Sequence, residues 1–100
     1  MNPDIQEKIF KFETFVNDVL KEDLAKLEQK LDTKNGEIAE FLQLKGHYME
    51  FSLHDALAVI NVRIKLLEQQ IKHFRKEIAN TNAHIKLILL GIRELQGFDD

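Results

Sequence analysis

Histidine and glutamate side chains four residues apart are the positions in this sequence that come nearest to a metal site. The two pairs are His73 with Glu77 and Glu50 with His54. Residues four apart lie on one face of a helix, so each pair could offer two ligands to a cation. A zinc site needs three or four ligands, and no third lies nearby in the sequence. We therefore interpret both pairs as exposed surface residues and predict neither a metal nor a cofactor.

Catalytic chemistry has no recognisable set of residues in this chain. There is no cysteine, which excludes a thiol nucleophile, a thiolate metal site and a disulfide. No glycine-rich phosphate loop is present, and no nucleophile stands beside a base. We predict that the protein is not an enzyme and that it has no catalytic, cofactor-binding or metal-binding residues.

Charge and hydropathy exclude two further classes of partner. The net charge is −3, and acidic and basic residues, together 31% of the chain, are interleaved along it. Without a basic stripe to follow a phosphate backbone, we predict no nucleic-acid binding. The longest apolar run, residues 56–60, has five residues, far short of the roughly 20 residues of a membrane span. The first residues do not resemble a signal peptide. We predict no membrane partner.

Apolar residues recur in alternating steps of three and four along two long segments, which is the pattern of a coiled-coil seam. The first series is Ile5, Ile9, Phe12, Val16, Leu20, Leu24, Leu27, Leu31, Lys34, Ile38 and Phe41, and the second is Leu57, Ile60, Ile64, Leu67, Ile71, Phe74, Ile78, Thr81, Ile85, Ile88 and Ile92. The second series mirrors the first with one irregular step. A mirrored seam closes only if the chain reverses direction, so the sequence predicts an all-α fold, a long antiparallel two-helix coiled-coil hairpin.

One domain over residues 1–100 is expected, with a helix at 3–45, a connector at 46–52 and a helix at 53–96. Pro3 suits the first helical position, Gly46 is a stop signal, and Ser52 has a capping-box spacing to Asp55. The short connector forces the two helices to be antiparallel neighbours.

A turn signal, Asn35-Gly36, falls inside the first helix. The seam keeps its phase across this dipeptide, so we expect the helix to continue, and a break at Gly36 is the alternative.

The irregular step consists of successive four-residue spacings at Val16, Leu20 and Leu24. It lies opposite a polar seam residue, Thr81, in the predicted hairpin. An inserted residue alters a supercoil locally. The feature is either a tolerated flaw or a flexible joint.

More apolar residues are present than a two-helix seam can bury, and they gather at the two ends of the predicted hairpin. We call the set near the connector the bend surface: Leu42, Leu44, Val59, Val62 and Leu66. We call the set near the free ends the tip surface: Phe10, Phe15, Leu87, Leu89 and Leu90. Apolar residues on several faces of a helix indicate a covering partner. The alternative is that scattered surface leucines and valines are ordinary. We expect the bend surface to serve assembly and the tip surface to contact partners or clients.

Several motifs resemble those of a known family. They are FETFVNDVL at 12–20, Asp23-Leu24, Leu42-Gln43-Leu44, MEFSL at 49–53, Ala56-Leu57, Ala83-His84-Ile85 and GIRELQG at 91–97. Together they resemble the UXT-type prefoldin-like alpha subunits of the prefoldin alpha family, over nearly the whole chain.

This resemblance implies a helical-hairpin subunit of a hexameric assembly, in which the helices form tentacles whose tips hold unfolded clients. It also implies a link with transcriptional co-regulation. Alpha subunits carry two β-hairpins between their helices, which residues 44–52 cannot hold. The segment from Gly46 to Phe51 resembles only the last strand, so we expect a connector with some strand character.

The expected function is that of a non-enzymatic prefoldin-like co-chaperone subunit that assembles with partner subunits and contacts clients through its helix faces. The alternative is a coiled-coil adaptor or transcription co-regulator that docks one defined protein. The expected partners are other prefoldin-like subunits and client or regulatory proteins, in a hetero-oligomer. The expected location is the cytoplasm, the nucleus or both.

Overall fold

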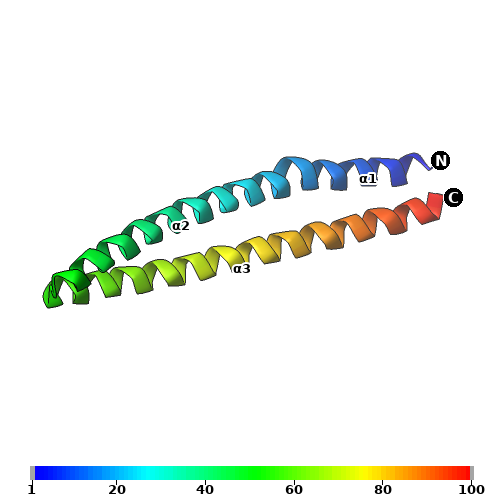
Figure 1. The fold of residues 1–100 in the computed structure, drawn as a ribbon. Helices are drawn as coiled ribbons and strands as arrows, with labels where there is room; N and C mark the ends of the chain where they lie inside the picture. The colour runs from blue at the N-terminus through cyan, green and yellow to red at the C-terminus, as the bar shows by residue number, and fades with distance from the viewer. Residues whose placement is uncertain (1, 100) are drawn as a thin grey trace. The chain divides into compact units, whose positions relative to one another are not determined.

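Helices make up nearly all of residues 2–99, the part of the chain that the computed structural model describes (Figure 1). The order is α1 (Pro3–Phe15), a π-helical turn η1 (Val16–Leu20), α2 (Lys21–Glu50) and α3 (His54–Asp99). The all-α prediction is confirmed. The described residues include no strand, so the expected strand character of the connector is wrong.

The chain divides into two compact units, and α2 and α3 each run unbroken through the division. We call the part from Glu28 to Lys76 the hairpin unit, and the parts up to Leu27 and from Glu77 onward the terminal unit. In the hairpin unit α2 and α3 run antiparallel on either side of the turn (Figure 1). In the terminal unit α1 runs beside the last part of α3 in the opposite direction (Figure 1).

The core of the hairpin unit lies along the predicted seam. Ile60, Ile64, Leu67 and Ile71 are buried, and Leu67 has 0% of its surface exposed. The predicted α2 seam residues of this unit are half-buried: Leu31, Lys34, Ile38 and Phe41. Apolar residues at steps of three and four form one stripe on a helix, so the burial follows from the spacing.

The core of the terminal unit is smaller. Its buried residues are Val16, Leu20 and Ile92, and the other seam positions are half-buried, with one exception. Phe12 was expected on the seam but is 42% exposed. It lies in the last turn of α1, directly before the π-helical turn, and a single facing helix covers only part of so large a ring.

The irregular step in the seam coincides with η1. The backbone N–H of Lys21 donates to the carbonyl oxygen of Val16, a hydrogen bond across five residues that defines a π turn. The wider turn accommodates one extra residue, which lets Val16 and Leu20 both be buried. In the same unit the Thr81 hydroxyl donates to the carbonyl oxygen of Glu77 at 3.0 Å, so this seam hydroxyl has a partner within its own helix.

Gly46 does not end the first long helix, because α2 continues to Glu50. Glycine lowers helix stability but permits helical geometry, and backbone hydrogen bonding continues through it. Gly36 likewise lies inside α2, which confirms the expected continuity there. At the other end α3 reaches Asp99, beyond the expected end at residue 96.

The turn between α2 and α3 is a Schellman motif built around Ser52. Leu53 N–H donates to Tyr48 O at 2.9 Å, and Ser52 N–H donates to Met49 O at 3.2 Å. Ser52 has φ of 54°, a left-handed conformation in which glycine is usual. Leu57 N–H bonds to Leu53 O, so Leu53, and not the expected Ser52, stands at the cap position of α3.

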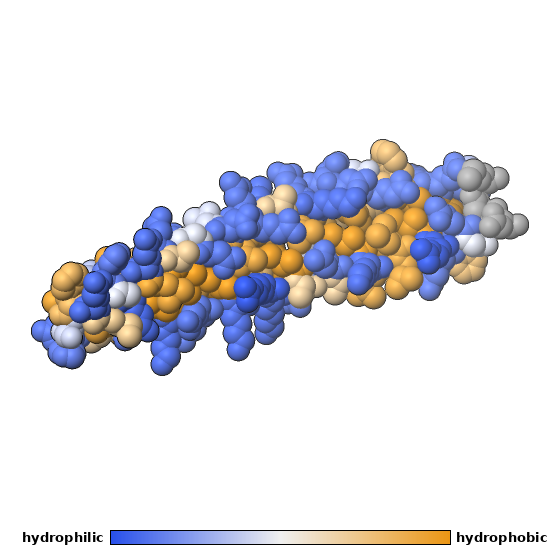
Figure 2. Space-filling view, in the orientation of Figure 1, coloured by the Kyte–Doolittle hydropathy of each residue, from blue (hydrophilic) through white to orange (hydrophobic). Residues whose placement is uncertain are grey.

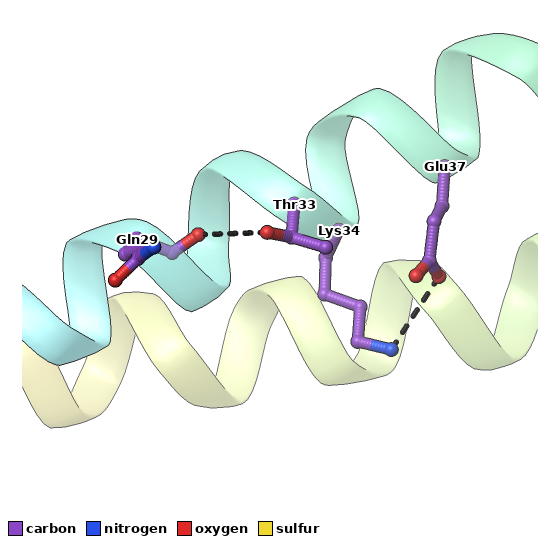
Figure 3. A network of polar contacts seen from close by, with 4 residues as sticks. All are labelled: Gln29, Thr33, Lys34 and Glu37. Carbon is purple, nitrogen blue, oxygen red and sulfur yellow. Dashed lines mark hydrogen bonds and ion pairs between the residues drawn. The ribbon is translucent and has the colours of Figure 1, made fainter.

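Lys34 shows how a charged residue is accommodated on the seam of the hairpin unit. Its aliphatic stem crosses toward α3, and its ammonium is 3.4 Å from Glu37 Oε2 (Figure 3). Its side chain is 26% exposed, which leaves the charge near water. On the same helix the Thr33 hydroxyl donates to the carbonyl oxygen of Gln29 (Figure 3).

Candidate interaction surfaces

All five residues of the bend surface are exposed to solvent. Val59 and Val62 are 72% and 70% exposed, and Leu42, Leu44 and Leu66 are between 38% and 50% exposed. Val59, Val62 and Leu66 follow at steps of three and four, so they share one face of α3. Leu42 and Leu44 are two residues apart and therefore point to different sides of α2. The five residues are exposed as predicted but do not form a single patch.

A groove beside the turn brings part of the bend surface together. It has a volume of about 470 Å³ and includes Leu44 and Val59 but not Leu42. Its lining residues come from both helices of the hairpin unit: Phe41, Leu44, Tyr48, Ala56, Val59, Ile60 and Arg63. Figure 2 shows hydrophobic surface between the helices in this unit, interrupted by hydrophilic side chains. The groove is therefore an apolar cleft with a single cation on its wall.

Arg63 supplies that cation. Its guanidinium carbon lies 5.8 Å from the centre of the Phe41 ring, within the range of a cation–π contact. The ion pairs recorded among residues 2–99 do not include it. The guanidinium has five N–H donors, and stacking on a ring leaves their edges available to an acceptor. The groove can thus bind an apolar side chain and a carboxylate together.

The turn itself carries three exposed apolar residues that the sequence interpretation did not include in a binding surface. Met49 is 60% exposed, Phe51 is 69% and Leu53 is 46%. The family resemblance placed Met49 and Phe51 in a strand remnant and Leu53 at the start of the second helix. The signal that could have found them is simpler, since large apolar residues at a tight helical turn have no neighbouring element to cover them.

The tip surface is also exposed, on the terminal unit. Phe10 and Leu87 are 68% and 67% exposed, and Phe15, Leu89 and Leu90 are between 40% and 52% exposed. Phe15 meets His84 of α3 edge-on, with ring centres 6.1 Å apart. His84 is three residues before Leu87, so Phe15, His84 and Leu87 lie on one flank of this unit. Leu87 and Leu89 are two residues apart and therefore point to different sides of α3, so the tip surface is not a single patch.

Glu50 and His54 do not share a helix face as expected, because Glu50 ends α2 and His54 begins α3. Residues 2–99 include no group of three or more histidine, aspartate or glutamate side chains arranged to hold a metal ion. His73 packs near the ring of Phe74, with centres 6.0 Å apart. No helix within the described residues has the length and apolar character needed to cross a membrane.

Exposed apolar faces on paired helices are typical of proteins that act by contact with other chains, and the all-helical fold fits a non-enzymatic role. The chain is similar to proteins named Protein UXT. It is 26% identical to those of Homo sapiens and Bos taurus, over 94% of this chain and 87% of each relative. It is 26% identical to the Protein UXT homolog of Nematostella vectensis, over 96% of this chain and 88% of that protein. These matches confirm the resemblance to UXT-type prefoldin-like proteins.

Two other comparisons found nothing. No family model matches the chain. No solved structure matches it either.

The alignments also show that this chain is shorter than the relatives to which it is aligned. The alignment with the Homo sapiens protein is 136 positions long but includes 94% of a chain of 100 residues, so about 42 positions face a gap here. In this chain the two long helices α2 and α3 are joined by residues 51–53 alone. The length difference agrees with the expectation that the central β-hairpins are missing.

Proposed function

We propose that this chain is a non-enzymatic prefoldin-like co-chaperone subunit. In this proposal it assembles with other prefoldin-like subunits near the turn and contacts client proteins with its terminal unit. The observation that carries the proposal is the tip surface, five large apolar side chains exposed on helices of a UXT-type chain. Burying them against an unfolded client would gain about 25 cal/mol for each Å² of apolar area removed from water.

The experiment changes Phe10, Phe15 and Leu90 together to serine. All three are exposed, so helix content should stay nearly constant in circular dichroism. We expect a loss of protection when an unrelated protein is denatured in the presence of the variant, measured by light scattering. The matched control changes Val59, Val62 and Leu66 to serine, three exposed residues of the hairpin unit. This control should alter the oligomeric state more than client protection. Full protection by the tip variant would contradict the proposal.

The second candidate is an adaptor or transcription co-regulator that docks one defined protein. The short turn favours it, because a chain joined by residues 51–53 has no room for the β-hairpins of an alpha-subunit platform. An adaptor would bind its partner saturably and give no protection to unrelated unfolded chains. Identifying the proteins that co-purify with the chain from its native extract would separate the two. Residence in the cytoplasm or nucleus is part of both proposals.

A further inference from the structure

We infer that Ser52 is a phosphorylation site for a protein kinase that recognises acidic residues. This modification site is not part of the proposed function and does not depend on it. The sequence interpretation used Ser52 and Asp55 as a helix cap, but Leu53 takes the cap position in the structure. The hydroxyl and the carboxylate are therefore free of the role that the sequence suggested for them.

The Ser52 hydroxyl is accessible. Ser52 is exposed in the short turn between α2 and α3, the two helices of the hairpin unit (Figure 1). Within residues 2–99 its hydrogen bond is made by the backbone N–H, to Met49 O, and the hydroxyl itself has no partner. A protein kinase binds its acceptor residue in an extended segment, so the acceptor has to leave regular structure. Helix ends fray, and opening them costs much less than opening the buried seam.

The other serine and threonine hydroxyls of the chain are poorer acceptors. Thr33 and Thr81 lie inside α2 and α3, and each hydroxyl donates to a carbonyl oxygen of its own helix. Thr14 is half-buried within α1. The residues three positions after these threonines are not acidic: Asn17, Gly36 and His84. Ser52 therefore differs from all of them in both accessibility and sequence context.

The charges around Ser52 select the class of kinase. Asp55 stands three residues after it and Glu50 two residues before it, and both are exposed. Residues 46–62 include no lysine or arginine. A kinase with basic side chains in its substrate groove can pair with these carboxylates. Kinases that require arginine before the acceptor, or proline directly after it, find neither here.

The transfer needs ATP as its one co-reactant. Ser52 Oγ attacks the γ-phosphorus, the bond from this phosphorus to the β,γ-bridging oxygen breaks, and ADP leaves. The hydroxyl proton passes to the carboxylate base of the kinase. The phosphoserine formed carries about −1.5 to −2 charge at neutral pH.

The phosphate changes the character of the turn. Met49, Phe51 and Leu53 are exposed around it. A partner that buried these residues would also have to remove water from the phosphate, at a high cost in free energy. Phosphorylation therefore turns an apolar surface into one that stays in water. This consequence, unlike the modification itself, rests on the proposed assembly near the turn.

The test incubates the full chain with ATP and purified casein kinase II, a kinase that prefers acidic substrates. Mass spectrometry should find one added phosphate, on Ser52. Ser52→Gly should accept none, and glycine suits the left-handed turn, so the variant folds. Asp55→Asn should lower kcat/KM at least about tenfold, because it removes a charge-assisted contact with the kinase. The matched control, Glu50→Gln, should lower it less than about threefold, as expected for a peripheral charge.

Two results would overturn the site directly. The first is a chain that accepts no phosphate or accepts it on a threonine. The second is an Asp55→Asn variant as reactive as the unchanged chain. Leu31→Ala adds a third criterion, since it weakens the half-buried seam and not the turn. Its phosphorylation rate should equal that of the unchanged chain. A rate that rises in proportion to the lost stability would mean that the hairpin must unfold first, and Ser52 would not be a site of the folded chain.

The effect on assembly is measured separately. The phosphorylated chain should recover fewer prefoldin-like subunits from its native extract than the unmodified chain, as identified by mass spectrometry. Equal recovery would overturn the effect of the phosphate. Recovery of no such subunit by either form would contradict the proposed function alone and leave the phosphorylation of Ser52 unaffected.

Discussion

Leu67 is the best single test of the hairpin seam. None of its surface is exposed, and it stands among the buried residues Ile64 and Ile71 of α3. Truncating a fully buried leucine removes apolar contacts and leaves a cavity, at a cost of about 2–5 kcal/mol. We predict that Leu67→Ala lowers the free energy of unfolding by this amount, measured by urea denaturation followed by circular dichroism.

Leu27 and Leu89 provide a graded comparison. Leu27 is on the predicted seam but half-buried, so Leu27→Ala should cost less than Leu67→Ala. Leu89 is 48% exposed and off the seam, so Leu89→Ala should cost least. Each measurement needs the same protein concentration, because self-association adds to the measured stability. Equal effects at all three positions would mean that the seam is wrongly assigned.

Within residues 2–99, Ser52 is the one non-glycine residue with a positive φ, a conformation that its side chain disfavours. Its φ of 54° lies in the left-handed region, where a residue with a Cβ atom costs roughly 1–2 kcal/mol relative to glycine. We predict that Ser52→Gly stabilises the chain by up to about 1 kcal/mol, since the greater freedom of unfolded glycine offsets part of the gain. The measurement is the urea midpoint. Ser52→Val should shift it in the opposite direction, and a stabilising valine would contradict the turn geometry.

At the scale of single residues, the sequence predicted which residues are buried better than it predicted where helices begin and end. Spacing identified Ile60, Ile64 and Leu67 because burial depends on a repeated pattern, to which many residues contribute. The helix end at Gly46 and the cap at Ser52 each depended on one local preference. Backbone hydrogen bonding carried α2 past Gly46 to Glu50, and the Schellman turn then used Ser52 in a role usual for glycine.

At the scale of elements, the π-helical turn accommodates the extra residue that makes the seam irregular. Removing one residue between Val16 and Leu20 would restore steps of four, three, four and three. The seam residues on both sides of η1 would then still face α3. We predict that deleting the exposed residue Asn17 converts η1 to regular α-helix and raises the melting temperature. Amide hydrogen exchange near Leu20 should become slower than in the unchanged chain.

The matched control deletes Gln29, an exposed residue of α2 in the hairpin unit. That stretch has no extra residue to lose, so the deletion should rotate the preceding seam away from α3 and lower the melting temperature. Thr81→Ile should also stabilise the terminal unit modestly, because it replaces a half-buried hydroxyl with apolar surface. If the Asn17 deletion destabilises as much as the Gln29 deletion, the π turn is a required feature and not an accommodated insertion.

The same periodicity explains why elements were easier to predict than surfaces. A mirrored seam contains enough information to pair two helices, because each apolar position requires a facing one. The residues outside the seam obey no such requirement. Leu42 and Leu44 look adjacent in sequence, yet helical geometry separates them and only Leu44 reaches the groove. Arg63 showed its contact with Phe41 only in three dimensions, because cation–π pairs leave no spacing rule.

Across the whole molecule, the buried residues are clustered in the hairpin unit and widely spaced in the terminal unit. The hairpin unit has four buried apolar residues within residues 60–71, whereas the terminal unit has Val16, Leu20 and Ile92. The terminal unit also contains the π turn and two highly exposed aromatic residues, Phe10 and Phe98. Regions with fewer buried contacts open more often. The unit that carries the tip surface should therefore be the more dynamic one.

Hydrogen exchange can test both the faster opening of the terminal unit and the binding of clients by its tip surface. We predict that residues 3–15 exchange faster than residues 60–71 in the free chain, because less apolar area must be exposed to open them. When a denatured client is added, protection should increase around Phe10, Phe15 and Leu87, where exposed side chains become covered. Residues 44–63 should change little, since the proposed function assigns the region near the turn to subunit assembly and not to clients. Protection that instead increases only around the groove would place client binding at the turn, and the division of roles between the two units would then be wrong.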